Sequence, residues 1–428
     1  MFGGFRLFSY LCGIKNVNFS LMKRLGILLV IWFVCTALQA QSMAMVSGRV
    51  VSSATGERIS GASVMSKDRS ASVITNEDGF FTLKTKEKTA EIVVSHLGYL
   101  TERVSLEGHN GSDLVIRLRP ATIQLQDLLV VSSNPRELVE AAIRRIPANY
   151  SRQPQLYHCF YRETAMKRQH FITVAEGVVD MYKTSYTAIT GRDRVAILKG
   201  RRLLSSKQSD TLSVKVLGGP VAAVQLDVVK NLDFLLNAEE LNCYTMQMEP
   251  PTTIGDRRQF VVSISPQCTL DYALQHGKLY IDQETLAFTR VELSLDMADR
   301  DKATRVMLVK KPFGVRFRPK ELSYMIDYRM DDDGVMHFIY MRTTFRFNCD
   351  WRRRLLATSF AATCEMVVTN REQAEDVHPI SGRESFDSRD AFFDKVDYFR
   401  DPDFWLDYNI IEPTESLDKA VERLLKKR

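Results

Sequence analysis

Residues 48–106 decide the fold of the N-terminal part of the chain, and they read GRVVSSATGERISGASVMSKDRSASVITNEDGFFTLKTKEKTAEIVVSHLGYLTERVSL. Short runs of β-branched and aromatic residues alternate with turns that contain Gly, Asp and Asn. This spacing is typical of a small β-sandwich, in which each strand is followed by a tight turn. A turn at residues 76–79 ends in Gly79, which can adopt a positive φ. We expect strands at residues 46–51, 59–67, 80–83, 92–94 and 114–118.

Four short motifs of this stretch are Gly48–Val50, Gly61–Val64, Asp78–Phe81, and Gly98 with Tyr99. In this combination the stretch resembles the carboxypeptidase-regulatory-like domain, a transthyretin-like β-sandwich that many exported Bacteroidetes proteins carry. The resemblance covers residues 45–120. It implies that this part of the chain is a binding or scaffolding module of the cell envelope.

Residues 1–40 have the pattern of a signal peptide. Lys23 and Arg24 precede an apolar run, and cleavage is expected after Ala40. The alternatives are a membrane anchor, for which the apolar run is short, and lipid attachment at Cys35, which lacks small residues before it. We therefore predict export, either to the periplasm or to a position associated with the outer membrane.

The charge of the chain does not indicate binding to nucleic acid. The formal net charge is +6, but residues 1–40 carry four basic side chains and no acidic one. Without that segment the net charge falls to +2. This is too small for the basic surface with which proteins bind phosphate backbones.

Residues 121–156 are expected to form a linker and a helix. The linker, residues 121–133, resembles the segment that follows this domain in nutrient-importing outer-membrane receptors, but the barrel of such a receptor needs more residues than remain. Asn134 is expected to cap the helix and Pro147 to end it at Ile146. We expect this helix to act as a strut between two domains.

Residues 157–380 are expected to form a larger, antiparallel β domain. Alternating apolar residues predict hairpins at 321–347 and 277–295, and residues 222–236 are expected to form a helix. The rhythm resembles the curved sheet of lipoprotein-carrier proteins, which wrap an apolar ligand. Residues 381–428 predict an irregular aromatic strap and a last helix. The fold class predicted for the chain is mainly β: the sandwich, then the antiparallel β domain with a few helices.

The sequence contains no recognisable catalytic or metal-binding motif. None of its histidines has Glu at the spacing of a zinc peptidase, and the GxSxG, P-loop and GxGxxG motifs are absent. We therefore predict no enzyme activity, no cofactor and no metal. Among the five cysteines after residue 40, sequence position favours Cys349 with Cys364 as a disulfide. Buried free thiols are the alternative.

Tyr161, Arg162 and Glu163 form a compact group after Phe160. The group resembles a recurring feature of exported Bacteroidetes proteins that carry the same N-terminal domain. Two interpretations are open: a buried Arg–Glu pair that organises a ligand site, or a strand whose charges face solvent. The second is the commoner arrangement of charged residues in a strand.

Phe404 and Trp405 lie among acidic residues of the C-terminal strap. Aromatic rings beside carboxylates can bind sugars, but a tryptophan in an irregular segment more often anchors domain packing, which we expect here. Asp210, Thr211 and Leu212 fit a pattern that resembles the O-glycosylation signal of periplasmic Bacteroidetes proteins. Thr211 is therefore a candidate for glycosylation.

These features favour a non-enzymatic binding or scaffold protein of the cell envelope. The sandwich would dock to an outer-membrane or periplasmic protein, through which the chain could associate with the membrane. The larger β domain would bind an apolar or peptide-like ligand, or a partner strand at a free sheet edge. One alternative is an outer-membrane β-barrel with a soluble N-terminal domain, although the basic C-terminal helix and the charges on both strand faces count against it. Another is a hydrolase of unrecognised type, since acidic pairs such as Asp401 with Asp403 are available.

Overall fold

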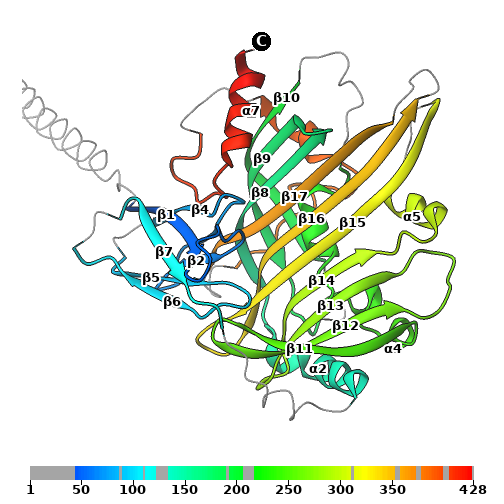
Figure 1. Ribbon diagram of the computed structural model, residues 1–428, viewed down its shortest axis with the longest axis horizontal. Helices are drawn as coiled ribbons and strands as arrows, with labels where there is room; N and C mark the ends of the chain where they lie inside the picture. Colours follow the sequence, from blue (N-terminus) through cyan, green and yellow to red (C-terminus); the bar gives the residue numbers. More distant parts are fainter. Residues whose placement is uncertain are drawn as a thin grey trace, which may run out of the picture. The chain divides into compact units, whose positions relative to one another are not determined.

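The structure is a computed structural model of the chain. It describes residues 44–85, 89–108, 111–121, 134–188, 192–205, 216–309, 313–351, 357–372, 377–398 and 404–426. The predicted signal peptide and Thr211 therefore lie outside the described residues. In the part that is described, no helix is both long and apolar enough to cross a membrane. β-Strand is the predominant regular structure of the described chain (Figure 1), which confirms the predicted fold class.

The first seven strands form two small sheets that enclose an apolar core, as in a β-sandwich. One sheet has the strand order β4-β1-β7 and the other β3-β2-β5-β6. Their bounds are β1 Ala44–Ser52, β2 Ser63–Ser66, β3 Ser72–Ile74, β4 Phe80–Thr85, β5 Glu91–Ser95, β6 Glu102–Ser105 and β7 Leu114–Leu118. The core contains Val50, Leu83 and Ile92, each of them fully buried. The strands thus alternate between core and surface, as the sequence pattern predicts.

Glycines explain two details of this sandwich. β1 and β7 run parallel, and Gly48 lies so close to Leu114 that an added Cβ would be 2.5 Å from the Leu114 carbonyl oxygen. Gly61 has a positive φ of 72°, so the strand predicted from residue 59 begins only at Ser63. The strands β3 and β6 are missing from the prediction because they have only 3 and 4 residues.

The rest of the chain, as far as the structure describes it, contains one sheet of eleven strands (Figure 1), which is antiparallel except for the short β18. Its strand order is β11-β12-β13-β14-β15-β16-β17-β8-β9-β10-β18. The bounds are β8 Gln155–Lys167, β9 His170–Lys183, β10 Arg194–Leu204, β11 Tyr244–Ile254, β12 Arg257–Pro266, β13 Gln275–Asp282, β14 Phe288–Leu295, β15 Val315–Met330, β16 Met336–Trp351, β17 Thr358–Arg371 and β18 Asp397–Tyr398. The predicted hairpins are present as β13–β14 and β15–β16. β8, the first strand of this sheet in the sequence, pairs with β17, its last long strand.

One face of the large sheet, here called the inner face, is covered by helices. α2 Pro135–Asn149 is capped by the Asn134 side chain, as predicted, and continues past Pro147 to Asn149. Its buried residues, such as Val139 and Ala142, belong to the same apolar core as the inner-face strand residues. The expected role of a strut between two domains is therefore wrong, because α2 packs onto the sheet.

Residues 222–236 do not form the single helix that the sequence predicts. Instead, residues 219–241 contain the short elements η3 Gly219–Val221, α3 Ala222–Gln225, η4 Leu232–Phe234 and α4 Ala238–Leu241. Asp227, Val228 and Val229 are consecutive and all buried. A continuous helix with one buried face cannot bury three residues in a row, so the chain breaks there and fills the inner face with irregular turns.

The opposite face, here called the outer face, is covered by the sandwich and by the C-terminal residues. Ile74 of β3 packs with Phe160, Val178 and Trp405 in one apolar cluster. Residues 404–413, here called the strap, cross this face, and α7 Glu415–Lys426 follows them. The hydroxyl of Thr414 caps α7 by accepting from the Leu417 N–H.

The disulfide expected between Cys349 and Cys364 is wrong. The disulfide joins Cys243 and Cys268 instead, while Cys349 and Cys364 are buried free thiols. In the β16–β17 register Cys349 lies opposite Thr358, so Cys364 is six residues further along β17. At about 3.4 Å per residue this is far beyond the Cα separation that a disulfide allows.

Both edges of the large sheet are protected. At the β11 edge, Pro250 and Pro251 interrupt the ladder with β12, and a bulge lies between Glu249 and Thr252. At the other edge, β10 is bordered by β18 and by Phe386, whose N–H donates to the Val195 carbonyl. Proline and covering segments of this kind block the pairing of a further strand.

Candidate functional site

Strand alternation separates the three residues that the sequence places together in β8. Tyr161 and Glu163 lie on the inner face, where the Tyr161 hydroxyl donates to Glu163 at 2.8 Å. Arg162 lies on the outer face and pairs with Glu176 of β9 at 2.7 Å. All three residues are buried, so the interpretation of charges facing solvent is wrong. The buried Arg–Glu pair exists, but its acid is Glu176.

Glu176 joins Arg162 to the predicted aromatic pair of the strap. Its carboxylate accepts from Arg162 and Arg201 and, at 3.2 Å, from the indole N–H of Trp405. Burial alone would raise the pKa of Glu176, but the two guanidinium groups hold it below its ordinary value. Trp405 is 5% exposed, so no ring face is open for a sugar. This cluster therefore anchors the strap, which is the packing role that we expected for Trp405.

We predict that Glu176→Gln loosens the strap. The buried Arg162, the partly exposed Arg201 and the Trp405 N–H would then share a neutral acceptor, which removes the negative charge that Glu176 provides. Chymotrypsin, followed by mass spectrometry, should cleave at Phe404 to Tyr408 about tenfold faster than in the unmodified protein. The exposed Glu107→Gln serves as the control and should be cleaved at the original rate. Equal rates for the two variants would contradict the anchoring role.

The inner face holds a second buried polar cluster, around Lys183 and Asp227. Both residues are fully buried, and the Lys183 ammonium lies 2.6 Å from the Asp227 carboxylate. The hydroxyls of Tyr186 and Tyr328 donate to the same carboxylate at 2.8 and 2.6 Å. Burial would lower the pKa of Lys183, but Asp227 and Asp193 raise it above its ordinary value. The cluster is closed by its own side chains and is a structural element of the core.

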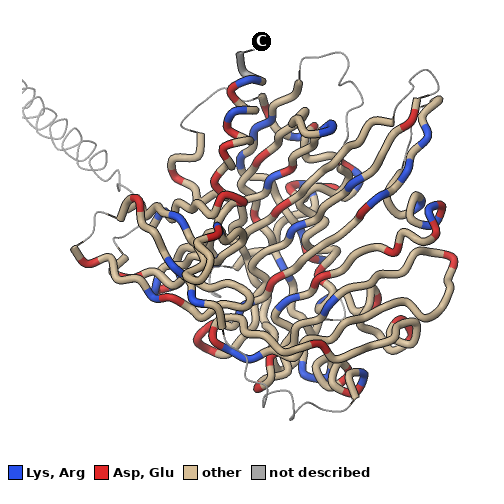
Figure 2. Tube along the Cα trace, in the orientation of Figure 1, with Lys and Arg blue, Asp and Glu red and all other residues tan. Residues whose placement is uncertain are grey.

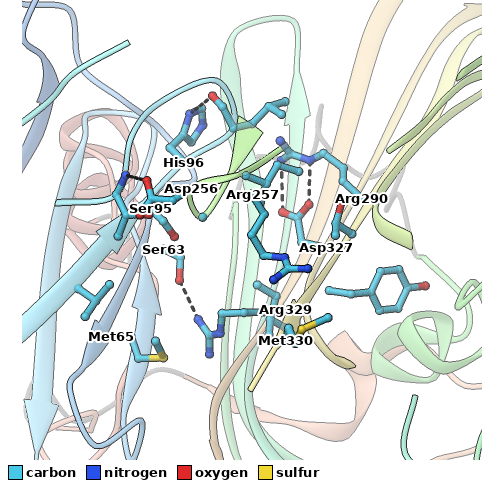
Figure 3. A pocket seen from close by; sticks show the side chains of 18 of the residues that line it. Ser63, Met65, Ser95, His96, Asp256, Arg257, Arg290, Asp327, Arg329 and Met330 are labelled. Atoms are coloured by element: carbon cyan, nitrogen blue, oxygen red, sulfur yellow. Dashed lines mark hydrogen bonds and ion pairs between the residues drawn. The ribbon is translucent and has the colours of Figure 1, made fainter. Parts of the chain in front are cut away.

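A pocket of about 210 Å³ lies between the sandwich and the outer face of the large sheet (Figure 3). Ser63 and Met65 of β2 face it from the sandwich, because the intervening Val64 points into the sandwich core. The large sheet contributes Arg329 of β15 and Arg257 of β12. We call this site the Arg329 pocket.

Arginine dominates the lining of the Arg329 pocket. Five arginines and three aspartates line it: Arg69, Arg103, Arg257, Arg290, Arg329, Asp256, Asp282 and Asp327. Arg257 is bound to Asp282 through two hydrogen bonds of 2.6 and 2.7 Å. Arg290 pairs with Asp327 across the β14–β15 ladder at 2.7 Å. Two of the three aspartates are therefore paired with arginine, and the third, Asp256, accepts from the Thr101 N–H at 2.7 Å.

Arg329 is the exception in this pocket. Its guanidinium donates to the Ser63 hydroxyl at 3.0 Å (Figure 3), and no carboxylate of the described residues lies within ion-pair distance. Burial, together with the nearby Arg69 and Arg371, lowers the pKa of Arg329 to about 10. The side chain therefore still carries its charge at neutral pH. The hydroxyl of Thr101 in the same wall is buried and has no hydrogen-bond partner.

Such a pocket has the chemistry of an anion site. A guanidinium group offers several N–H donors in one plane and matches the geometry of a carboxylate or phosphate. In the described residues no group of His, Cys, Asp and Glu side chains is arranged to hold a metal ion. The sequence alone does not reveal the pocket, because its walls come from segments around residues 63, 257 and 329. An arginine in a strand does not differ in sequence from a surface arginine.

Comparison with known proteins supports the prediction made for the N-terminal domain. Residues 46–130 match the family model described as the CarboxypepD_reg-like domain, which confirms the resemblance of that part of the chain. No curated protein matches the sequence significantly.

Three solved structures share some backbone geometry with the chain. A putative outer membrane lipoprotein-sorting protein domain from Vibrio parahaemolyticus is 10% identical, covers 57% of this chain and 95% of its own, and has a TM-score of 0.25. A DUF1329 family protein from Desulfovibrio piger is 12% identical, with coverage of 55% and 94% and a TM-score of 0.22. MucB in complex with MucA(peri) is 10% identical, with coverage of 54% and 94% and a TM-score of 0.17. At these TM-scores the structural similarities say nothing about the function of this chain.

Proposed function

We propose that this chain is a non-enzymatic binding protein of the cell envelope whose Arg329 pocket recognises a carboxylate or phosphate group on its partner. The observation that carries the proposal is the half-buried Arg329, which has no carboxylate partner among the described residues. An unpaired cation in such a place is unfavourable, and an anionic ligand would compensate it. Ser63 supplies a hydroxyl beside the guanidinium, and Thr101 supplies another in the pocket lining.

The geometry supports an anionic ligand better than an apolar one. The inner face, where a curved sheet would hold an apolar molecule, is packed with α2 and the turns of residues 216–241. Addition of a partner strand is also disfavoured, because prolines interrupt β11 and the residues around β18 border β10. Export, an outer-membrane or periplasmic protein partner, and location in the periplasm or at the outer membrane are parts of the same proposal.

Replacing Arg329 tests this function directly. We expect inorganic phosphate or acetate, titrated at constant ionic strength and followed by calorimetry, to bind the unmodified protein. Arg329→Met should weaken that binding at least tenfold, because the bidentate, charge-assisted hydrogen bonds from the guanidinium to the anion are lost. The stronger of the two anions identifies the group that the partner carries. Because Arg329 pairs with no carboxylate in the part of the chain that the structure describes, this variant should keep its stability.

Arg346→Met is the matched control. Arg346 lies outside the pocket, and its side chain is 63% exposed. It should bind both anions like the unmodified protein. In the native envelope, mild crosslinking should recover one defined protein with Arg346→Met but not with Arg329→Met. Equal anion binding by the two variants would refute the pocket as the recognition site.

A further inference from the structure

One end of the large sheet carries apolar side chains that project into solvent. Val306 is 47% exposed, Val309 84% and Phe313 fully exposed. They lie at the end of α5 Arg300–Met307 and in the connection to β15. α5 buries Ala303 against the sheet and leaves Val306 on its outward side. Large apolar groups that are this exposed and this close together mark an interaction surface.

Basic residues surround these apolar side chains. Between residues 300 and 320 the described part of the chain has six basic residues and one acidic residue, Asp301, and two of the basic residues, Lys302 and Arg318, pair with Asp299 and Asp350. Arg305 of α5 and Arg316 of β15 are both exposed, and Figure 2 shows basic residues along the start of β15. We call Arg305, Val306, Val309, Phe313 and Arg316 the cationic tip.

An aromatic group continues the cationic tip on the neighbouring strand. Trp351 at the end of β16 lies opposite Val315 and is half-buried. Its ring contacts that of Phe360, with centroids 6.2 Å apart. Tryptophan beside cations and exposed apolar residues is the composition of protein segments that lie in the interface of a bilayer.

We propose that the cationic tip binds the surface of an anionic phospholipid bilayer. Phe313 and Val309 would enter the boundary between headgroups and acyl chains, where exposed apolar surface leaves water. Arg305 and Arg316 would lie at the level of the lipid phosphates, and each such contact strengthens with the anionic lipid content. The charge of the tip selects this occupant, because a zwitterionic surface would offer the basic residues no net attraction.

Vesicle sedimentation tests the proposal. The protein, purified as its host processes it, is mixed with vesicles of phosphatidylcholine alone or with 30% phosphatidylglycerol. We expect binding to the anionic vesicles only, and a loss of binding as salt screens the charges. Val309→Asp combined with Phe313→Asp should reduce the bound fraction at least tenfold. The fluorescence of Trp351 should shift to shorter wavelength on anionic vesicles, and Trp351→Phe should abolish that shift.

Val115→Asp combined with Leu198→Asp is the matched control. These residues are 51% and 53% exposed and lie on β7 and β10, away from the tip. The control should bind vesicles like the unmodified protein, and so should Arg329→Met, which separates this surface from the anion pocket. The proposal fails if the unmodified protein does not bind anionic vesicles; the cationic tip would then have to bind an acidic protein instead. It also fails if the tip variant and the control bind equally.

Discussion

Asp227→Asn is expected to lower the free energy of unfolding by about 3 kcal/mol. The variant has one acceptor oxygen where Asp227 has two, so only one of the Tyr186 and Tyr328 hydroxyls keeps its acceptor, and it removes the charge that faces the fully buried Lys183. Asp193 lies 3.6 Å from Lys183 and already serves Lys230 at 2.6 Å, so it replaces Asp227 only in part. Urea unfolding followed by circular dichroism would measure the loss as a lower midpoint.

Two further variants show whether the lost charge is the cause. Lys183→Met combined with Asp227→Asn removes both charges and should recover most of the stability, since a buried pair replaced by neutral residues of similar volume is tolerated. Asp387→Asn removes a partly exposed aspartate paired with the exposed Arg389 and should leave the midpoint unchanged. A double variant as unstable as Asp227→Asn would contradict the electrostatic explanation.

Glu163→Gln is expected to stabilise the protein at high pH and to leave it unchanged at low pH. Burial raises the pKa of Glu163 from 4.5 to about 8, against the hydrogen bond from Tyr161. Between these two pH values the folded chain holds a proton that the unfolded chain has lost, so the free energy of unfolding falls as pH rises. The slope is about 1.4 kcal/mol per pH unit. Glutamine does not titrate, so the variant should lack this fall.

Urea unfolding at pH 5, 6, 7 and 8 would show the effect. The stability difference between Glu163→Gln and the unmodified protein should be near zero at pH 5 and reach about 3–5 kcal/mol at pH 8. Glu107→Gln, which changes an exposed carboxyl, should run parallel to the unmodified protein throughout. If the stability difference between Glu163→Gln and the unmodified protein is the same at every pH, Glu163 is not a buried carboxyl that stays protonated in the folded chain.

The sequence predicts the elements that depend on local patterns. The Asn76–Gly79 turn forms, with the Asn76 side chain accepting from the Phe80 N–H, and the β15–β16 hairpin keeps the predicted alternation of Leu322, Tyr324 and Ile326. The break of the helix at Asp227 could not be predicted, because it depends on Lys183, a residue of another segment. The predicted domain boundaries at residues 120, 156 and 380 stay predictions.

The functional residues were harder to predict than the fold. Arg162 and Trp405 are singled out by the sequence, yet their common partner, Glu176, lies on the next strand and belongs to no motif. Arg329 is distinguished only by what surrounds it in three dimensions, which periodicity does not report. Thr211 lies outside the described residues, so its glycosylation stays a prediction.

The pairing of β8 with β17 has a consequence for the order in which the protein is made. Cys159 lies opposite Val368 in that ladder, so synthesis from the N-terminus completes β8 long before β17 exists. Until then the edge of β8 that pairs with β17 has free backbone N–H and C=O groups, whereas its other edge can already pair with β9. Contacts between residues so far apart in the sequence form slowly. A nascent chain that ends before residue 358 would therefore expose an unpaired sheet edge that is prone to aggregation, so the last sixth of the polypeptide protects the part that is made before it.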